Sequence, residues 1–515
     1  MNWLLVALTM LDIKLNRRSS QELSQQLYEQ IKALVLSGNL RPGARIPSSR
    51  DLAQSLKVSR PTVAAGLAQL EAEGYLNVVH GSGVYVSPEL PGRRRRGVSG
   101  EETASAKPTR GAGRGAGRSP VASDVTIEHQ LSEYGTFVRA LSEKFDGIAQ
   151  KEPEIAFYCW RPALDQFPSV EWARIVGKHA RACEETDFDD TAEPAGILAL
   201  RKAIAGLAQR FRGVSCTSDQ VIVLNGVNQG IDLVARMHLE SGISAAVEDP
   251  GYHVARSLFS ACGARVIPVP VDEDGLSVAD LRASARRNCR LLYVTPSHQF
   301  PTGATMTLAR RLELLQWAKQ AAAVVLEDDY DSEFHASAKP IPALMSLDKH
   351  ESVLYLGALN QLMFPSLGLA YLIVPPSLVR SYARARDLTG VQLPPHLQAA
   401  IAEFIDSGLL ERHVKRLSNL YSQRRACLVQ ALEKHLGQQV TIRGTSAGVF
   451  ILATFDTRLS MEEIRKRALQ AGVGLIDTRP FYADKQSSRE FILGFGSLTE
   501  KKIEEGVRRI ARALR

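Results

Sequence analysis

The chain has 515 residues, too many for one ordinary hydrophobic core, so two or more domains are expected. Its 45% hydrophobic and 23% charged residues are typical of a soluble globular protein. A net charge of +8 suits a polyanionic partner, although a few basic surface loops would give the same value. The six cysteines are scattered without a C-x-x-C spacing, which argues against disulfides and structural zinc. No metal site is expected, and a reducing cytoplasm fits this cysteine usage.

Residues 1–19 are expected to form a loose N-terminal extension. The apolar stretch from Trp3 to Leu11 is interrupted by Asp12 and Lys14 and is far shorter than the roughly 20 residues of a membrane span. No basic region precedes it and no small-residue cleavage site follows, so the sequence predicts neither a membrane segment nor a signal peptide.

Residues 20–88 show the pattern of three helices followed by a hairpin. Apolar residues at helical spacing predict helices over residues 22–36, 50–56 and about 61–73. Ser48 and Ser59 are expected to cap the second and third helices. Residues 75–79 and 84–86 flank Gly81-Ser82-Gly83 as a two-stranded wing. This order is that of a winged helix-turn-helix, whose third helix enters the DNA major groove.

Candidate DNA contacts lie where the predicted helices begin and on the wing. Arginine bonds guanine acceptors or clamps a phosphate, serine and threonine bond phosphate, and glycine lets the wing backbone approach the DNA. For any one of these residues ordinary capping or turn chemistry is the commoner role, and only the combination is specific. The predicted contacts are Ser48, Ser49, Arg50, Ser59, Arg60, Thr62, Gly81 and Gly83.

Residues 89–125 are predicted to be a flexible basic linker. The stretch from Ser87 to Pro120 has no apolar period and holds eight basic residues against three acidic ones. A solvated tether is its simplest role, and non-specific contact with DNA phosphates is a second one.

Residues 126–515 alternate short apolar strands with helical patterns. Short buried strands between helices predict an α/β domain with a mainly parallel sheet. The clearest strand candidates are residues 221–224, 244–247, 265–269, 291–294, 323–326 and 352–356.

Three short segments, residues 248–252, 295–303 and 327–331, follow predicted strands. They are expected at the carboxyl ends of those strands, where open α/β sheets bind ligands. An aromatic ring to stack on a flat ring, a carboxylate for a pyridinium nitrogen and a phenol beside a ring hydroxyl would suit pyridoxal phosphate. Each segment alone is a weak signal, because Pro-Thr-Gly is usually a turn and acidic runs are usually solvated.

Four runs in the N-terminal module resemble the GntR family of bacterial regulators: residues 27–31 (LYEQI), 40–53 (LRPGARIPSSRDLA), 58–63 (VSRPTV) and 70–76 (LEAEGYL). That resemblance implies binding of double-stranded operator DNA as a homodimer in the bacterial cytoplasm.

Together with the strand-end segments and residues 493–498 (LGFGSL), these runs make the chain similar to the MocR-type branch of that family. Such proteins join a winged helix through a linker to a fold-type I aminotransferase-like domain. The implied fold is three-layered and mainly parallel, with a smaller α+β subdomain at about residues 385–515.

The resemblance implies a place for pyridoxal phosphate. By that match Asp328 would face the pyridine nitrogen, Tyr330 the ring oxygen and Tyr252 the ring face. The phosphate would meet the backbone of Gly226, Val227 and Asn228 where a strand passes into a helix.

The chain departs from the family pattern at the residues that hold this cofactor. Gln361 stands at the position of the Schiff-base lysine, and Gly368 at that of an arginine that helps to hold the phosphate. A glutamine amide forms no Schiff base and cannot transfer protons as an amine does. Ile492 stands where aminotransferases usually place a carboxylate-binding arginine, and Arg489 is a candidate substitute.

We therefore expect no catalytic residues, no covalently bound pyridoxal phosphate and a domain that senses a small effector by favouring one arrangement of the paired winged helices. The predicted effector-site residues are Val227, Asn228, Tyr252, Asp328, Tyr330, Gln361 and Arg489. Four alternatives stay open. The cleft could bind pyridoxal phosphate only loosely, or the domain could be a bare dimerisation scaffold. The chain could also be a ligand-free dimeric DNA-binding protein, or a working aminotransferase, which Gln361 disfavours.

Overall fold

The structure is a computed structural model, and it describes residues 13–17, 19–79, 82–88, 131–145, 152–184, 193–285, 288–335, 342–390, 392–484 and 489–515. The chain divides into two compact units, residues 1–119 and residues 120–515. Residues 1–12 of the predicted extension, Gly81 of the predicted wing and the whole predicted linker lie outside the described residues.

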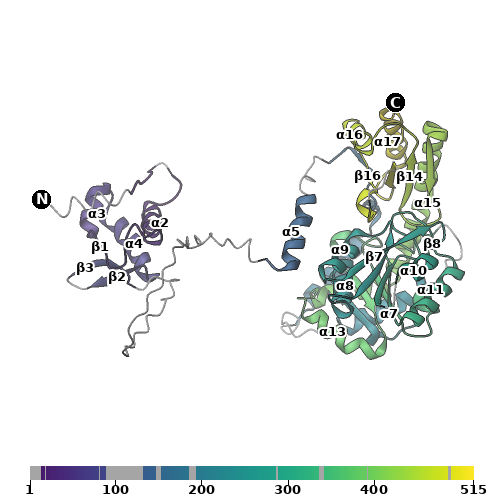
Figure 1. Ribbon diagram of the computed structural model, residues 1–515, viewed down its shortest axis with the longest axis horizontal. Coiled ribbons are helices and arrows are strands. Elements are labelled where there is room, and N and C mark those ends of the chain that lie inside the picture. Colours follow the sequence, from purple (N-terminus) through teal and green to yellow (C-terminus); the bar gives the residue numbers. More distant parts are fainter. Residues whose placement is uncertain are drawn as a thin grey trace, which may run out of the picture. The chain divides into compact units, whose positions relative to one another are not determined.

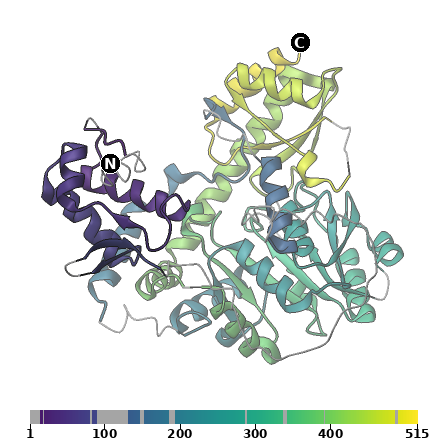
Figure 2. The same cartoon turned by 60° about the vertical axis from the view of Figure 1, so that its left-hand side comes forward.

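The described part of the first unit contains three helices and a small antiparallel sheet (Figure 2). The helices are α2 (Leu23–Leu36), α3 (Ser49–Leu56) and α4 (Arg60–Ala72), and the strands are β1 (Arg45–Ile46), β2 (Leu76–Val79) and β3 (Gly83–Val86). The sheet order is β1-β3-β2. The three predicted helices and the hairpin of the wing are confirmed, whereas β1 is an addition that the sequence pattern does not reveal.

Apolar side chains of all three helices form the core of this unit. Leu27 and Ile31 of α2 and Val63 and Leu70 of α4 are fully buried. Each such side chain contributes about 1.5–3 kcal/mol of hydrophobic stabilisation. The predicted apolar stripe of the first helix ends one residue early, because the side chain of Leu36 is 54% exposed.

The structure differs from the predicted extension at residues 13–16, which pack against α2 instead of lying loose. The side chain of Ile13 is 8% exposed and belongs to the core of the unit. The backbone N–H of Lys14 donates to Gln30 Oε1 at 2.9 Å, and that of Asn16 donates to Gln26 Oε1 at 2.8 Å. The winged-helix module therefore begins before residue 20.

The second unit is an α/β domain with a large and a small lobe (Figure 1). Its helices are α5 (Glu133–Phe145), α6 (Ser169–Arg181), α7 (Leu198–Arg212), α8 (Val227–His238), α9 (His253–Ala261), α10 (Val278–Ser284), α11 (Leu308–Ala321), α12 (Leu344–Leu347), α13 (Val379–Asp387), α14 (Pro395–Asp406), α15 (Leu409–Leu436), α16 (Met461–Gln470) and α17 (Glu500–Ala513). Its strands are β4 (Ile155–Ala156), β5 (Val221–Leu224), β6 (Ser244–Asp249), β7 (Arg265–Asp272), β8 (Gly275–Leu276), β9 (Cys289–Val294), β10 (Val324–Asp329), β11 (Val353–Ala358), β12 (Ala370–Ile373), β13 (Val440–Arg443), β14 (Phe450–Phe455), β15 (Val473–Gly474), β16 (Ile476–Asp477) and β17 (Glu490–Gly494).

An eight-stranded sheet in the order β5-β12-β11-β10-β9-β6-β7-β8 forms the middle layer of the large lobe. The neighbours from β11 to β7 pair in parallel, whereas β12 is antiparallel to both β11 and β5. Helices α8, α9 and α13 pack on one face, and α7, α10 and α11 pack on the other. The predicted three-layer, mainly parallel fold is confirmed. The carboxyl ends of β5, β6, β9, β10 and β11 meet at one edge of this sheet.

The small lobe is built on the antiparallel sheet β13-β14-β17-β16, against which α16 and α17 pack. Helix α15 runs from the large lobe into this lobe (Figure 2). Strand β4, far upstream in the sequence, pairs with β15 of the small lobe. The small lobe therefore includes residues that precede the predicted subdomain. Among the described residues, no helix is both long and apolar enough to cross a membrane.

Candidate DNA-binding surface and effector site

The N-termini of α3 and α4 carry six of the predicted DNA contacts. The Ser48 hydroxyl accepts a hydrogen bond from Asp51 N–H, and the Ser59 hydroxyl accepts one from Thr62 N–H, each at 3.3 Å. Ser59 Oγ and Thr62 Oγ1 also lie 2.6 Å apart. These three hydroxyls are used in helix capping, the commoner role that the sequence leaves open for them.

Arg60 and Ser49 connect the starts of the two helices, because Arg60 Nε donates to Ser49 Oγ at 3.4 Å. The side chains of Arg50 and Arg60 are exposed, and no carboxylate among the described residues pairs with either of them. Two exposed guanidinium groups therefore stand in the first turns of α3 and α4.

A further exposed arginine, Arg45, lies beside the wing. Strand β1 pairs with β3, so that Arg45 lies opposite Tyr85. Gly83 has a φ of +128°, and a Cβ built there would lie 3.0 Å from Arg45 Nε. The exposed Arg45 guanidinium thus packs over the predicted wing glycine. Sequence reasoning missed Arg45, since a strand of two residues has no alternation to detect.

The acidic segments of the second unit lie inside strands, not after them as predicted. Glu248 is part of β6 and Asp328 is part of β10. Their side chains are only 1% and 4% exposed. These acidic residues are therefore buried, whereas acidic runs usually lie in solvated loops. Tyr330 follows β10 directly, and Tyr252 follows β6 after Pro250 and Gly251.

Asp328 presents one free carboxylate oxygen. The Tyr293 hydroxyl donates to its Oδ2 at 2.5 Å, whereas its Oδ1 is buried without a hydrogen-bond partner among the described residues. Burial raises the pKa of Asp328 to about 7, because the carboxylate loses its water shell. A ligand with a donor or a positive charge would satisfy this oxygen.

The predicted phosphate corner lies at the start of α8. Gly226 is the N-cap of α8 with a φ of +108°, and a Cβ there would lie 3.7 Å from the Gly368 carbonyl oxygen. Gly226 and Gly368 are therefore neighbours, although the chain separates them widely. The Tyr252 hydroxyl donates to Asn228 Oδ1 at 3.0 Å, which ties the end of β6 to this corner. A Cβ built at Gly368 itself would have no atom within 4 Å among the described residues.

The phenol of Tyr330 is held by the loop after β9. Its hydroxyl donates to the His298 carbonyl oxygen at 2.8 Å. His298 Nδ1 in turn lies 2.9 Å from both carboxylate oxygens of Asp331. A Cβ at Gly448 would lie 2.0 Å from His298 Cε1, so only glycine allows this approach. His298 and Asp331 lie in two of the segments at strand ends, but no motif marks either residue as functional.

Gln361 lies after β11 with a side chain that is 7% exposed, and its Oε1 has no hydrogen-bond partner among the described residues. Arg489 is not brought to this site: its Nε donates to the Leu459 carbonyl oxygen at 2.7 Å. Ile492 instead packs in the apolar cluster that Tyr252 and Tyr330 border. The prediction that Arg489 belongs to the effector site is therefore not supported by the structure.

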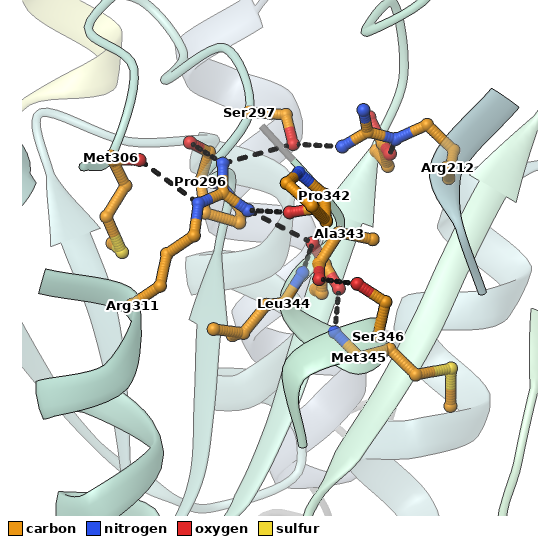
Figure 3. A network of polar contacts seen from close by, with 12 residues as sticks. Arg212, Pro296, Ser297, Met306, Arg311, Pro342, Ala343, Leu344, Met345 and Ser346 are labelled. Atoms are coloured by element: carbon orange, nitrogen blue, oxygen red, sulfur yellow. Dashed lines mark hydrogen bonds and ion pairs between the residues drawn. The ribbon is translucent and has the colours of Figure 1, made fainter. Parts of the chain in front are cut away.

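A polar network beneath the site fixes the loop after β9 to the sheet (Figure 3). Arg311 donates to the carbonyl oxygens of Pro296, Met306 and Pro342 at 2.8, 3.0 and 3.1 Å. Arg212 donates to Ser297 Oγ at 2.6 Å and to Asp329 Oδ2 at 2.5 Å. Because these charges are paired in the interior, the loop that carries His298 and Phe300 has a rigid base.

Comparison with known proteins agrees with both units. Residues 23–86 match the model for bacterial regulatory proteins of the gntR family, and residues 164–510 match aminotransferase class I and II. The probable rhizopine catabolism regulatory protein MocR of Rhizobium meliloti is 33% identical over 96% of this chain and 94% of its own length. The chain belongs to the MocR-type branch of the GntR family of transcription regulators.

Two further proteins are similar to this MocR-type chain, one over nearly its full length and one over most of it. The HTH-type transcriptional regulator TauR of Rhodobacter capsulatus is 31% identical over 96% of each chain. LysN, an alpha-aminoadipate aminotransferase from Thermus thermophilus, was solved with N-(5'-phosphopyridoxyl)-L-leucine. It has a TM-score of 0.67 and 25% identity and covers 76% of this chain and 98% of its own. The second unit of this MocR-type regulator thus has an aminotransferase fold.

Proposed function

We propose that this MocR-type regulator binds operator DNA through α3, α4 and the wing, and that its aminotransferase-like unit senses a small effector without performing transamination. It works in the cytoplasm as a homodimer, since palindromic operators match a two-fold protein. The observation that supports the absence of transamination is Gln361, a residue with a buried side chain that follows the end of β11.

The residues of the site do not fit covalent pyridoxal phosphate. Gln361 offers an amide in place of an amine, and its Oε1 lacks a donor among the described residues. At the phosphate corner Gly368 supplies no cation and Val227 supplies no hydroxyl. A phosphate there would meet only backbone N–H groups at the start of α8. We derive no catalytic step through this cofactor.

An effector could control transcription only by binding one arrangement of the paired winged helices better than another. The orphan oxygen of Asp328, together with the rings of Tyr252 and Tyr330, supports effector binding over a bare scaffold. In a purely structural domain, a buried acceptor without a partner costs about 1–3 kcal/mol and gains nothing.

The test is a visible absorption spectrum of the purified full-length protein with added pyridoxal phosphate. We expect no band that survives dialysis. A band that persists after dialysis and disappears on borohydride treatment would refute the non-covalent, non-enzymatic proposal. DNA binding is tested separately by selecting duplexes from a random pool, with Arg60→Ala as the variant expected to lose the selected sequence.

A further inference from the structure

Three aromatic rings of the effector site surround a fourth. The ring centroid of Phe300 lies 4.9 Å from that of Trp160, 6.2 Å from that of Tyr252 and 6.4 Å from that of Tyr330. The Trp160 ring meets Tyr252 and Tyr330 edge to face, with both centroid distances 6.3 Å. Phe300 is buried, whereas Trp160 is 41% exposed, so this ring set is reachable from solvent. Such sets of tryptophan and tyrosine rings attract organic cations.

Three unsatisfied oxygen atoms near these rings are acceptors, and the ring nitrogen His298 Nε2 beside Tyr330 is also without a partner among the described residues. Asp328 Oδ1, Gln361 Oε1 and Glu248 Oε1 are all buried and have no hydrogen-bond partner among the described residues. Asp328 lies in β10, and Gln361 follows β11, which pairs with β10 in parallel. A ligand that satisfies them must bring N–H or O–H donors, and a positive charge would add a charge-assisted bond to Asp328.

The cations of the surrounding segments are already engaged. Arg212 pairs with Asp329. Arg256 donates to the Pro480 carbonyl oxygen at 2.8 Å, and Arg425 donates to the Gly448 carbonyl oxygen at 2.7 Å. With Gln361 and Gly368 in place of a lysine and an arginine, the site has little to offer a phosphate dianion.

We infer that the site takes an organic cation without a phosphate group, a flat ring or compact body that carries a protonated nitrogen. The exposed Trp160 ring, with Tyr252 and Tyr330 packed edge to face against it, borders the ligand, and the Asp328 carboxylate bonds its nitrogen. This inference rests on the proposed effector function and narrows it to one ligand class. It also reverses the charge preference of a site that is built for pyridoxal phosphate.

The probes are pyridoxamine and pyridoxamine 5'-phosphate, which share the ring and the ammonium group and differ only in the phosphate. Calorimetric titration of the full chain is expected to give a Kd for pyridoxamine at least tenfold below that for the phosphorylated form. Equal or tighter binding of pyridoxamine 5'-phosphate would overturn the inference. Absence of pyridoxamine binding at millimolar concentration would overturn it as well.

Asp328→Asn keeps the shape of the side chain and removes its charge, and we expect it to weaken pyridoxamine binding at least tenfold. Asp272→Asn is the matched control, because Asp272 is an exposed partner of Arg310. Trp160→Ala should weaken binding similarly, and Trp160→Phe should restore most of it. Unchanged affinity in both Asp328→Asn and Trp160→Ala would show that pyridoxamine binds elsewhere and would overturn the inference.

Gly368→Arg tests the charge preference from the other side. The space around a Cβ at Gly368 is open, although its φ of +63° strains any other residue. In this variant pyridoxamine 5'-phosphate is expected to bind at least tenfold more tightly than in the wild type. Thermal melts of each variant show whether it is folded. A borohydride-sensitive band with pyridoxal phosphate would refute the proposed function, whereas failure of the pyridoxamine series alone leaves that function standing.

Discussion

Gln361 is the residue that carries the proposed absence of transamination. Its side chain is buried next to the strand that carries Asp328, so the position has the enclosure that a reactive amine would need. The remaining frame is present: Tyr252 is tied to Asn228, and Tyr330 is held by the His298 carbonyl. The proposal therefore rests on side-chain groups that are missing at positions 361 and 368, and not on any loss of the fold.

Gln361→Lys is expected to restore covalent binding of pyridoxal phosphate, because a desolvated lysine amine is a good nucleophile. The variant should show a visible band that survives dialysis and is removed by borohydride, whereas wild type should show none. Gln398→Lys, at a buried position of α14, controls for non-specific modification of an introduced lysine. A variant that stays colourless would mean that the phosphate corner, with Gly368, is the larger defect.

The buried Asp328 carboxyl makes stability depend on pH. Burial raises its pKa to about 7, aided by the charges of Asp329 and Asp331 and opposed by the hydrogen bond from Tyr293. The folded state therefore holds a proton that the unfolded state loses near pH 4. This contribution to stability is complete below the unfolded pKa and is lost as the pH rises through about 7.

Asp328→Asn should remove this contribution. Between pH 5.5 and pH 8 the unfolding midpoint of the wild type is expected to fall by about 2 °C more than that of the variant. Differential scanning calorimetry at a series of pH values measures the difference. The exposed Asp272→Asn control should follow the wild type, and a parallel pH dependence in all three proteins would contradict the assignment to Asp328.

At the level of elements, the two-residue strand β1 adds a cation to the DNA-binding surface. Arg45 stands beside Gly83 of the wing and faces no carboxylate among the described residues. We expect Arg45→Ala to weaken operator binding about three- to tenfold and to reduce the slope of log affinity against log salt by about 1. Fluorescence anisotropy at several salt concentrations measures both, and Arg282→Ala, an exposed ion-paired arginine of the second unit, is the control. An unchanged slope would exclude a phosphate contact.

The helices and the hairpin of the winged helix could be predicted from short-range sequence signals. The caps Ser48 and Ser59 and the apolar periods all lie within one helix or turn, so the predicted boundaries are within a residue or two of the observed ones. Strand β1 was missed because two residues contain too little alternation to detect. Strand β12 has four buried residues, the same length as the predicted β5, and was not among the strands that the sequence indicated. The pairing of β1 with the wing, which places Arg45, is a tertiary contact that no local pattern encodes.

The effector site was predictable only where a motif marks a strand end. Tyr252, Asp328 and Tyr330 follow from the resemblance, and the structure places them at one sheet edge. Trp160 comes from a segment far upstream without a motif, so only the packing of β4 against the small lobe reveals its position. Arg489 was selected for its closeness in sequence to Ile492, but in a β-strand region a shift of three residues turns the side chain to the other face.

For the whole molecule, binding of an effector to the second unit must be energetically coupled to DNA binding by the first unit if the effector controls transcription. A ligand that binds one arrangement of the winged helices better than another changes operator affinity by that preference alone. Thermodynamic linkage then requires that operator DNA change the affinity for the ligand by the same factor. This reciprocity holds wherever the two units lie relative to one another and needs no assumption about the sign of regulation.

Pyridoxamine at saturation is therefore expected to change operator affinity by about 5- to 150-fold, the usual range of such coupling. Saturating operator should change the pyridoxamine Kd by an equal factor. Anisotropy gives the first quantity and calorimetry the second, both with the full-length protein. Trp160→Ala should need more pyridoxamine to reach its effect on DNA. Unequal factors would reveal non-specific binding in one assay, and a factor of one in both would leave an organic-cation site that plays no part in regulating DNA binding.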